Sequence, residues 1–294
     1  MLKVSILTPT YNRENQLEKC YESLLSQTNK NFEWVIIDDG STDSTSNRVK
    51  KFMKQDLFPV KYYYKENAGK HTALNRGFNL CEGELTLILD SDDVLTKNAV
   101  ERITSTWESI DNQKVKGLSF LRMYSDKKII GDSFPENNYL SDYIECRVNK
   151  KINGDKCEVF ETKTLKKYQF PTFEKEKFIG EHIIWIEIAK KYQTLHINEA
   201  IYITEYLEGG LTDSGRKLRI SCPNGGIQSS LAYLIPEVKL SIRLKNMLLL
   251  HSYLHFSKKN IFTIWQRLGK NKLLFLLTSP FGWLLYKKWN KQFN

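Results

Sequence analysis

The 294-residue sequence lacks the cysteine patterns of disulfide-bonded and zinc-binding proteins. Its five cysteines form no CxxC pair and no close cluster, and their number is odd. A disulfide framework normally uses an even number of cysteines, and structural zinc sites use closely spaced ligands. We therefore expect free thiols and a reducing compartment.

The sequence also lacks a secretory signal and the usual nucleotide-binding loops. Residues 1–9 contain no long apolar region with a small-residue cleavage site, so they are expected to form the first strand. The absence of GxxxxGK[ST] and GxGxxG argues against a P-loop NTPase and a Rossmann dehydrogenase. The uncharged stretch 273–286 is shorter than the ~20 apolar residues that cross a bilayer.

Acidic residues are nearly absent from the C-terminal region. From Gly215 onward there are 14 Lys and Arg but one acid, Glu237, which gives a net charge of +13. The preceding residues carry 30 basic and 33 acidic side chains. Such a basic region indicates contact with nucleic acid or with an anionic membrane surface.

Strands and helices alternate over roughly the first hundred residues. Short apolar strands are predicted at 4–8, where Pro9 ends the strand, and at 32–37, 60–64 and 85–89. Helical spacing of apolar side chains lies between them, and Asn12 is the expected N-cap of the first helix. This order predicts an α/β fold with a parallel, doubly wound sheet.

The remaining residues carry weaker patterns. We expect a hairpin of strands at 117–124 and 128–131, a strand at 158–162, a helix from Glu181, and a strand at 201–206. No assignment is made for 134–156. The C-terminal region is helical in pattern at 240–256 and 273–286, with the second stretch broken by Pro280 and Gly282.

Two of the predicted strands end in carboxylates. The apolar run at 85–89 leads into Asp90, Asp92 and Asp93, and the run at 32–37 leads into Asp38 and Asp39. Ligands of open α/β sheets bind at the carboxyl ends of the strands, where carboxylate oxygens suit Mg²⁺ or Mn²⁺. The alternative is an acidic loop that caps the following helix.

The two acidic strand ends are expected to share one crevice. Asp39 would accept a hydrogen bond from a base such as uracil. Asp92, with help from Asp90 or Asp93, would hold a divalent cation that neutralises a diphosphate leaving group.

The same residues carry a family resemblance. Val-Ser-Ile-Leu-Thr-Pro-Thr-Tyr-Asn-Arg at 4–13, Val-Ile-Ile-Asp-Asp-Gly-Ser-Thr-Asp at 35–43, Glu-Asn-Ala-Gly-Lys at 66–70 and Leu-Asp-Ser-Asp-Asp at 89–93 resemble the family 2 glycosyltransferases. The match is dense over the first hundred residues and thins afterwards. It implies the GT-A fold, a Rossmann-like doubly wound mixed sheet, here followed by a C-terminal helical extension.

The resemblance implies an inverting sugar transfer from a nucleotide-diphosphate sugar, with a UDP-sugar favoured and Mn²⁺ or Mg²⁺ as cofactor. It divides the chain into a transferase domain at 1–220, with a nucleotide-binding half at 1–100 and an acceptor half at 101–220, and a basic tail at 221–294.

The resemblance also assigns roles to individual residues. Pro9 and Tyr11 would border the nucleoside, and Asp39 would contact the base. Asp90, Ser91 and Asp92 would form the DxD motif, with Asp92 as the principal metal ligand. Lys70, Asn75 and Arg76 would contact the nucleotide sugar, with loop polarity and helix capping as the alternative.

Inversion requires a base for the acceptor hydroxyl. The family usually places it in a Glu-Asp pair at the start of a late helix, where this chain has Glu181 and His182. Glu181 is the preferred base because a carboxylate near a helix N-terminus stays ionised. His182 is the second candidate base or orients the acceptor. Residues 211–219 resemble a mobile loop that closes over the diphosphate, with a plain basic, solvated loop as the alternative.

Aromatic residues accompany the lysines of the tail. Trp283, Tyr286 and Trp289 beside lysines suit a membrane headgroup region. We expect a cytoplasmic enzyme held peripherally on the membrane, adding sugar to a glycan or polyprenyl-linked acceptor in cell-surface polysaccharide synthesis, without nucleic acid as a partner. The alternatives are a last helix that pairs with another subunit, and an inactive nucleotide-binding module that serves as a membrane-bound assembly partner.

Overall fold

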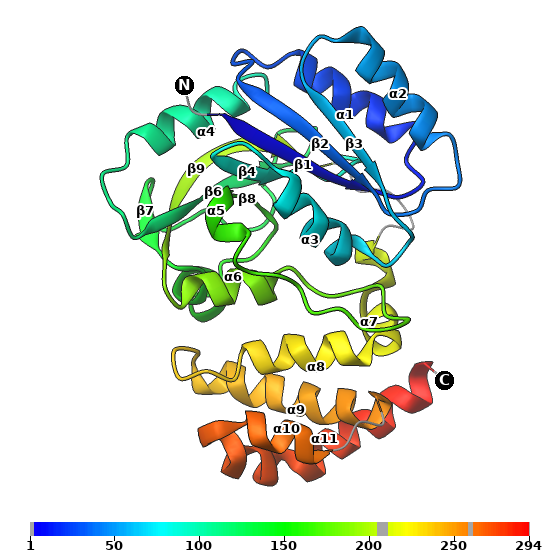
Figure 1. Ribbon diagram of the computed structural model, residues 1–294. Coiled ribbons are helices and arrows are strands. Elements are labelled where there is room, and N and C mark those ends of the chain that lie inside the picture. The colour runs from blue at the N-terminus through cyan, green and yellow to red at the C-terminus, as the bar shows by residue number, and fades with distance from the viewer. Residues whose placement is uncertain (1–2, 205–210, 258–260, 294) are drawn as a thin grey trace.

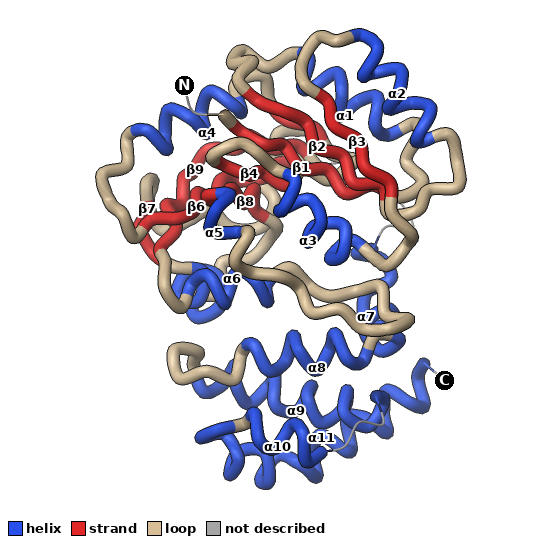
Figure 2. The backbone as a smooth tube through the Cα atoms, viewed as in Figure 1, coloured by secondary structure: helices blue, strands red, loops and turns tan. Residues whose placement is uncertain are grey.

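The computed structural model describes residues 3–204, 211–257 and 261–293. Within these residues the strands form one mixed sheet in the order β3-β2-β1-β4-β8-β6-β9-β5, and β7 pairs with β9 (Figure 1, Figure 2). The strands are β1 (Val4–Thr10), β2 (Phe32–Asp38), β3 (Val60–Tyr64), β4 (Leu85–Ile88), β5 (Val94–Leu95), β6 (Val115–Met123), β7 (Tyr139–Ser141), β8 (Lys156–Glu161) and β9 (Gln193–Ile203).

The first four long strands are parallel, and the later strands make the sheet mixed. β1 pairs in parallel with both β2 and β4, and β2 pairs in parallel with β3. β8 runs antiparallel between β4 and β6, and β9 runs parallel to β6. The predicted doubly wound α/β sheet is confirmed, together with its mixed character.

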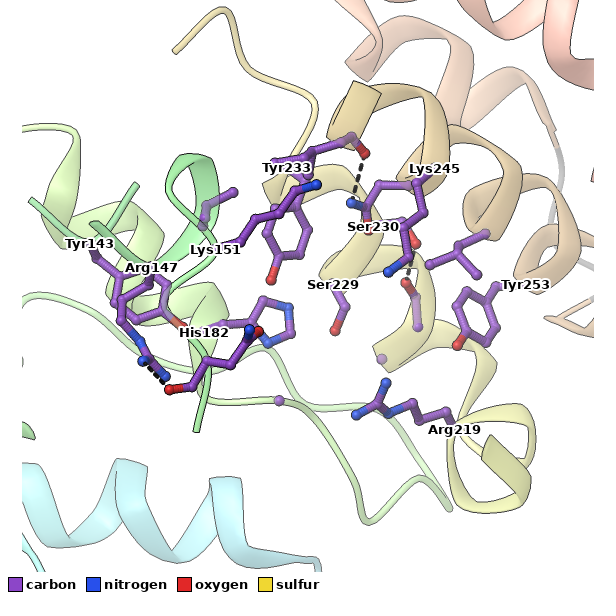
Figure 3. A pocket seen from close by; sticks show the side chains of 18 of the residues that line it. Tyr143, Arg147, Lys151, His182, Arg219, Ser229, Ser230, Tyr233, Lys245 and Tyr253 are labelled. Carbon is purple, nitrogen blue, oxygen red and sulfur yellow. Dashed lines mark hydrogen bonds between the residues drawn. The ribbon is translucent and has the colours of Figure 1, made fainter. Parts of the chain in front are cut away.

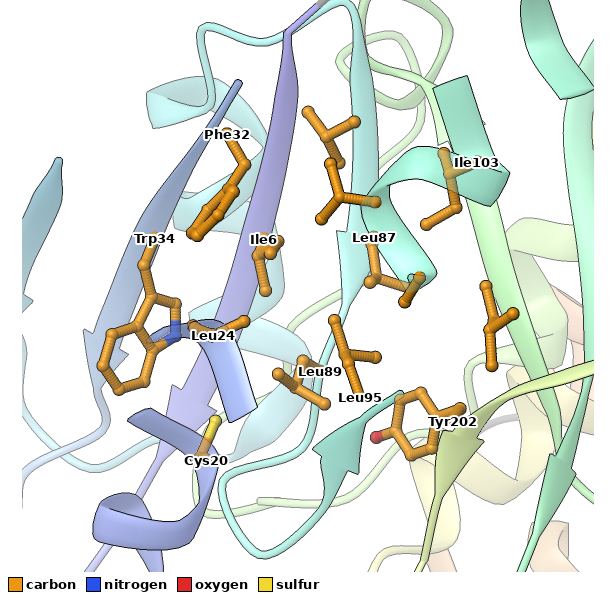
Figure 4. Close-up of a cluster of buried hydrophobic side chains, with 14 of the residues drawn as sticks. Ile6, Cys20, Leu24, Phe32, Trp34, Leu87, Leu89, Leu95, Ile103 and Tyr202 are labelled. Carbon is orange, nitrogen blue, oxygen red and sulfur yellow. The ribbon is translucent and has the colours of Figure 1, made fainter. Parts of the chain in front are cut away.

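Helices cover both faces of the sheet. Successive side chains of a strand point to opposite faces, and apolar side chains lie on each face, so both faces are buried. One core joins the sheet to α1 (Gln16–Leu25), α2 (Thr45–Gln55) and α4 (Ala99–Glu108), with Trp34 and Tyr202 among its buried residues (Figure 4). The opposite core uses α3 (Lys70–Leu80), α5 (Thr162–Leu165), α6 (His182–Ala189) and the π-helix η1 (Ile144–Asn149).

The C-terminal helices form a separate layer with its own apolar core (Figure 1). These helices are α7 (Leu211–Ser221), α8 (Pro223–Ala232), α9 (Leu240–Ser257), α10 (Ile261–Arg267), the 3₁₀ turn η2 (Gly269–Asn271) and α11 (Lys272–Phe293). α8 and α11 both pack on α9. The predicted helical extension is therefore present, whereas the domain boundary at 220 stays a prediction.

Two predictions near the N-terminus are wrong. β1 continues through Pro9 to Thr10 rather than ending before it. Asn12 does not cap α1, whose N-cap position is Asn15; it has a positive φ of 51° and its side chain accepts a hydrogen bond from the Thr42 N–H. Asn12 thus joins the loops after β1 and β2, which meet at the carboxyl edge of the sheet.

Later predictions are corrected where long-range pairing decides the structure. The expected second hairpin strand at 128–131 forms only a single bridge, Met123 to Ile129, because β6 pairs with β8 and β9. β9 begins eight residues earlier than expected, at Gln193, and residues 205 and 206 of the predicted strand lie outside the described residues.

The C-terminal predictions need two corrections. The expected mobile loop contains helix α7, which has a non-helical break at Gly215. α11 runs unbroken past Pro280 and Gly282. Gly282 lies so close to α9 that an added Cβ would come within 2.2 Å of the His251 side chain, so this glycine permits close helix packing rather than ending the helix.

Candidate functional site

The loop after β2 delivers a buried carboxylate to the carboxyl edge of the sheet. The Asp39 carboxylate accepts hydrogen bonds from the backbone N–H groups of Ala68 (3.0 Å) and Gly69 (2.7 Å) and pairs with Lys65. Asp38 is held separately by the Tyr62 hydroxyl at 2.6 Å. Asp39 is therefore fixed in position by the loop before α3.

Gly69 is required for this loop geometry. Its φ is +96°, which an L side chain rarely adopts, and an added Cβ would lie 2.1 Å from the Lys177 carbonyl oxygen. The backbone of the α3 loop can therefore approach both Asp39 and the segment before α6. Through the next residue, Lys70, the same loop reaches the acidic end of β4.

The three carboxylates after β4 have different partners. Asp90 pairs with Lys70 at 2.5 Å and lies 3.7 Å from Arg122. Asp93 lies 3.5 Å from the same Arg122 guanidinium. Among the ion pairs of the described residues, Asp92 has one long contact, with Arg13 at 3.9 Å. The geometry therefore leaves Asp92 as the least neutralised carboxylate of the three.

Burial and mutual repulsion oppose ionisation in this cluster. Burial, followed by the charge of Asp90, raises the pKa of Asp93 to about 7. The same two causes raise the pKa of Asp92. Burial opposes ionisation of Asp90 too, but Lys70 and Arg122 overcome it and lower the Asp90 pKa. A cation added beside Asp92 would relieve the repulsion.

Glu181 is connected directly to this acidic cluster. It is the N-cap residue of α6, and its carboxylate lies 2.8 Å from the Lys70 ammonium. Lys70 therefore bridges Glu181 and Asp90, and these two carboxylates raise the Lys70 pKa against the opposing effect of burial. The candidate base and the candidate DxD motif belong to one chain of ion pairs.

His182 points in another direction. Its ring stacks on Tyr233, the residue after α8, with centroids 5.2 Å apart, and its buried Nε2 has no hydrogen-bond partner among the described residues. Burial, followed by the charge of Arg219, lowers the His182 pKa to about 4. A neutral, weakly basic imidazole suits acceptor positioning better than proton abstraction.

Two adjoining cavities flank the start of α6. The smaller one, of about 350 Å³, is lined by Lys70, Arg122, Glu181 and His182 among others. The larger one, of about 680 Å³, lies between this region and helices α7, α8 and α9, with His182 at its wall (Figure 3). Tyr143 and His182 line both cavities, so the two spaces are neighbours.

The other predicted nucleotide-binding residues have varied positions. Pro9 and Ser91 are buried, whereas Tyr11 is 46% exposed at the end of β1. Asn75 bonds to the backbone of Phe170, and Arg76 donates to the Tyr64 carbonyl. These contacts of Asn75 and Arg76 fix local structure; their nucleotide-binding role stays a prediction.

Sequence reasoning missed Arg122 and Tyr202. Arg122 is on β6, stacks 3.8 Å from the centroid of the Tyr202 ring, and approaches both Asp90 and Asp93. The Tyr202 hydroxyl on β9 accepts a hydrogen bond from the Asp90 N–H at 2.9 Å. The one available signal was an arginine inside an apolar strand, which requires a buried anionic partner.

The carboxylates fit a cation held mainly by one protein side chain. Within residues 3–204, 211–257 and 261–293, no three His, Cys, Asp or Glu side chains form a metal-binding group. The expected trio of Asp90, Asp92 and Asp93 is thus not arranged as a complete site. Asp92 has the free oxygens for a Mg²⁺-type ion, which commonly takes one or two carboxylates together with substrate phosphates.

The family profile described as glycosyl transferase family 2 matches residues 5–167, more than half of the chain. Glycosyltransferase GlyA of Streptococcus pneumoniae is 40% identical over 101 residues, covering 34% of this chain and 14% of that protein. Glycosyltransferase GlyG of the same organism is 36% identical over 115 residues, covering 39% of this chain and 38% of that protein. The chain thus matches well under half the length of these relatives.

Solved structures share the fold over most of the chain. S. aureus TarS (residues 1–349) in complex with UDP-GlcNAc superposes with a TM-score of 0.65 and 22% identity, covering 87% of this chain and 73% of that one. The mannosyltransferase PcManGT of Pyrobaculum calidifontis, in complex with GDP-Man and Mn²⁺, superposes with a TM-score of 0.60 and 18% identity. The match covers 99% of this chain and 82% of that one.

Proposed function

The chain belongs to the family 2 glycosyltransferases, and on this basis we propose that it transfers a sugar from a nucleoside-diphosphate sugar to an acceptor hydroxyl with inversion. A UDP-sugar is the favoured donor and Mn²⁺ or Mg²⁺ the favoured cation. The observation that carries the proposal is the Lys70 bridge, which joins the candidate base Glu181 to the acidic end of β4. The nucleotide sugars bound by TarS and PcManGT support this choice.

The roles of the side chains follow from their positions. The Glu181 carboxylate takes the acceptor hydroxyl proton as the oxygen attacks the anomeric carbon and the bond to the diphosphate oxygen breaks. Lys70 holds Glu181 in place through their ion pair. Asp39 is fixed to receive a base N–H. A cation bound at Asp92 would offset charge on the departing diphosphate.

The first experiment measures UDP binding and then UDP release from UDP-sugars with Mn²⁺, in the presence and absence of candidate acceptors. We expect binding and acceptor-stimulated release. An inactive nucleotide-binding module would bind UDP but release nothing with any acceptor. The Lys70 bridge favours the enzyme, because an inactive module has no need to hold a carboxylate beside the donor site.

We further propose that α11 places the protein on an anionic membrane surface, on the cytoplasmic face, beside a polyprenyl-linked acceptor of cell-surface polysaccharide synthesis. Among the described residues no helix is both long and apolar enough to cross a bilayer. α11 instead has two apolar faces. One packs inward through Phe275 and Trp289, and the other exposes the following side chains: Leu273, Leu276, Leu277, Phe281 and Leu284.

Charge complementarity supports an anionic membrane as the surface that would cover the outward face of α11. Lysines border it at both ends, and the Lys287 ammonium lies 5.3 Å from the centroid of the Trp283 ring. Apolar residues between lysines and tryptophan suit the interface of an anionic bilayer. A second subunit would need a less basic surface, because two copies would bring like charges together.

Flotation with phosphatidylglycerol liposomes tests the membrane proposal. Changing both Leu277 and Phe281 to Asp should abolish flotation, whereas Leu57→Asp, at a residue 60% exposed between α2 and β3, should not. Retained flotation by the double variant would contradict the proposal. A concentration-dependent dimer lost in the same variant would instead assign this face to a second copy.

A further inference from the structure

The larger cavity carries a charge pattern that the proposed reaction does not explain. It lies beyond Glu181, between the start of α6 and helices α7 to α9, with a volume of about 680 Å³. Its basic lining residues are Arg147, Lys151, Arg219 and Lys245 (Figure 3). Its one acidic lining residue is Asp155. We propose that this cavity binds a phosphate group of the acceptor, so that the acceptor is a glycosyl or polyol phosphate. This inference rests on the proposed transferase function.

The basic side chains of the cavity are not neutralised by the protein. Among the ion pairs of the described residues, none joins Lys151, Arg219 or Lys245 to a carboxylate. The Arg147 guanidinium donates to backbone carbonyls, including that of Ile152 at 2.7 Å. Carbonyl oxygens leave the net positive charge in place. Cations that line the same cavity repel each other, and an anion bound between them would relieve that repulsion.

Two buried nitrogen atoms also lack partners beside these charges. Within the part of the chain that the structure describes, the buried His182 Nε2 and Arg147 Nε have no hydrogen-bond partner, and both residues line the cavity. A buried polar atom without a partner costs stability unless a ligand satisfies it. Phosphate oxygens accept hydrogen bonds from guanidinium groups and from a neutral imidazole N–H, and Arg binds phosphate particularly well.

The position of the cavity fits an acceptor rather than the donor. The donor side is the acidic cluster at the end of β4, where Lys70 pairs with Asp90. The smaller cavity, lined by Lys70, Glu181 and His182, adjoins the larger one. A phosphate held near Arg219 and His182 would thus leave the rest of the acceptor to extend toward Glu181. Tyr143, Tyr233 and Tyr253 add hydroxyl groups and flat ring faces to the larger cavity, and Tyr143 also lines the smaller one.

Isothermal titration of the full-length protein tests the inference. UDP and Mn²⁺ first saturate the donor site; glucose 1-phosphate is then compared with neutral methyl glucoside. We expect the phosphate probe to bind more tightly. Arg219→Gln and Lys245→Gln should each weaken its binding by about tenfold, because each removes a charge-assisted contact. Arg219→Lys should retain most of the binding. The matched control is Lys217→Gln. Lys217 is exposed, lies on α7 like Arg219, and does not line the cavity.

Three outcomes would overturn the inference: equal binding of the two probes, unchanged binding in both Gln variants, or equal weakening by Lys217→Gln. Failure of the wild-type protein to bind UDP would instead contradict the proposed function, so the two failures are distinguishable. A glucose phosphate with a short prenyl chain forms a second arm. Tighter binding of this probe than of glucose 1-phosphate identifies a lipid-linked acceptor, and equal binding identifies a soluble phosphate-containing acceptor.

Discussion

Two acidic clusters lie at opposite ends of the same parallel strands. At the amino edge, Glu33 of β2 is fully buried and accepts hydrogen bonds from Ser5 at 2.6 Å and from the backbone of Glu82. Lys61 and Lys3 also pair with it, at 2.8 and 3.3 Å. Burial opposes its ionisation, but these partners lower the Glu33 pKa to about 2.

The cluster at the carboxyl edge behaves in the opposite way. There burial and the neighbouring carboxylate raise the pKa values of Asp92 and Asp93. Each cluster contains a buried carboxylate and a lysine, so burial alone does not separate them. The difference is that the amino-edge cluster has enough donors for its buried carboxylate, whereas the carboxyl-edge cluster has more carboxylates than its cations neutralise. Incomplete neutralisation of this kind marks a ligand site.

The largest expected effect concerns Glu181 at the carboxyl edge. Glu181→Gln should lower kcat by about 10²–10⁴-fold, the usual contribution of a general base, while UDP affinity stays unchanged. Steady-state sugar transfer and UDP titration measure the two quantities. The matched control is Glu187→Gln in the same helix, which breaks only an ion pair with Lys190. Loss of UDP binding in Glu181→Gln would point to a structural role.

Removing Asp92 should separate function from stability. Asp92→Asn should reduce transfer by about 100-fold, because the cation loses its protein ligand, and should abolish the rise in Tm on adding Mn²⁺. The Tm without metal should not fall, because the ionised carboxylate is disfavoured in the folded protein. The control is the exposed Asp126→Asn. Full transfer by Asp92→Asn would refute the metal role.

The reciprocal change at the amino edge should affect stability alone. Glu33→Gln should lower the free energy of unfolding at pH 7 by about 1–3 kcal/mol through loss of charge-assisted hydrogen bonds, with transfer unchanged. Because the folded-state pKa is depressed, this stabilisation is present above about pH 4.5 and is lost as the pH falls toward about 2. Urea unfolding across that range is the measurement.

The control for Glu33 is its exposed neighbour. Glu82 pairs with Lys61 at 2.6 Å, but its side chain is 66% exposed. Glu82→Gln should therefore change the unfolding free energy by less than about 1 kcal/mol. Equal losses in Glu33→Gln and Glu82→Gln would show that burial of the carboxylate does not matter.

The last effect concerns His182, which lies in neither cluster and acts only as the pH falls. Its pKa is depressed to about 4 in the folded protein. As the pH falls, the His182 imidazole therefore takes up a proton at a higher pH in the unfolded chain than in the folded protein. Stability should therefore fall, by up to about 3 kcal/mol, as the pH drops from about 6.5 toward 4. His182→Asn should reduce that fall. An identical pH profile of Tm in wild type and variant would contradict this.

The sequence predicted structure best where local patterns and long-range pairing agree. The boundaries of β3 and the parallel arrangement of the first four strands followed from short apolar runs between amphipathic helices. The acidic strand ends were predictable for the same reason, because parallel neighbours bring their carboxyl ends to one edge. The contacts Asp39 to Gly69 and Lys70 to Asp90 join those two ends.

The sequence was least informative where partners are distant in the chain. β9 begins with polar residues such as Gln193 and Asn198, which give no strand periodicity, and it is held by pairing with β6 and β7. Arg122 and Tyr202 reach the site only through that pairing. Pro280 suggested a break, yet packing of α11 on α9 outweighs the local cost of a proline in a helix. The spacing of residues along the sequence indicates neither the pairing of distant strands nor the packing of one helix on another.

The late position of β9 in the chain has a consequence for synthesis on the ribosome. β9 pairs with one edge of β6. It also pairs with β5, and the paired residues Val94 and Ile203 are more than one hundred positions apart in the sequence. Until residue 203 leaves the exit tunnel, β6 has one unpaired edge lined by apolar side chains. Contacts between such distant residues also form slowly. The nascent protein should therefore depend on chaperones longest in this part of the sheet, well after its N-terminal half has collapsed.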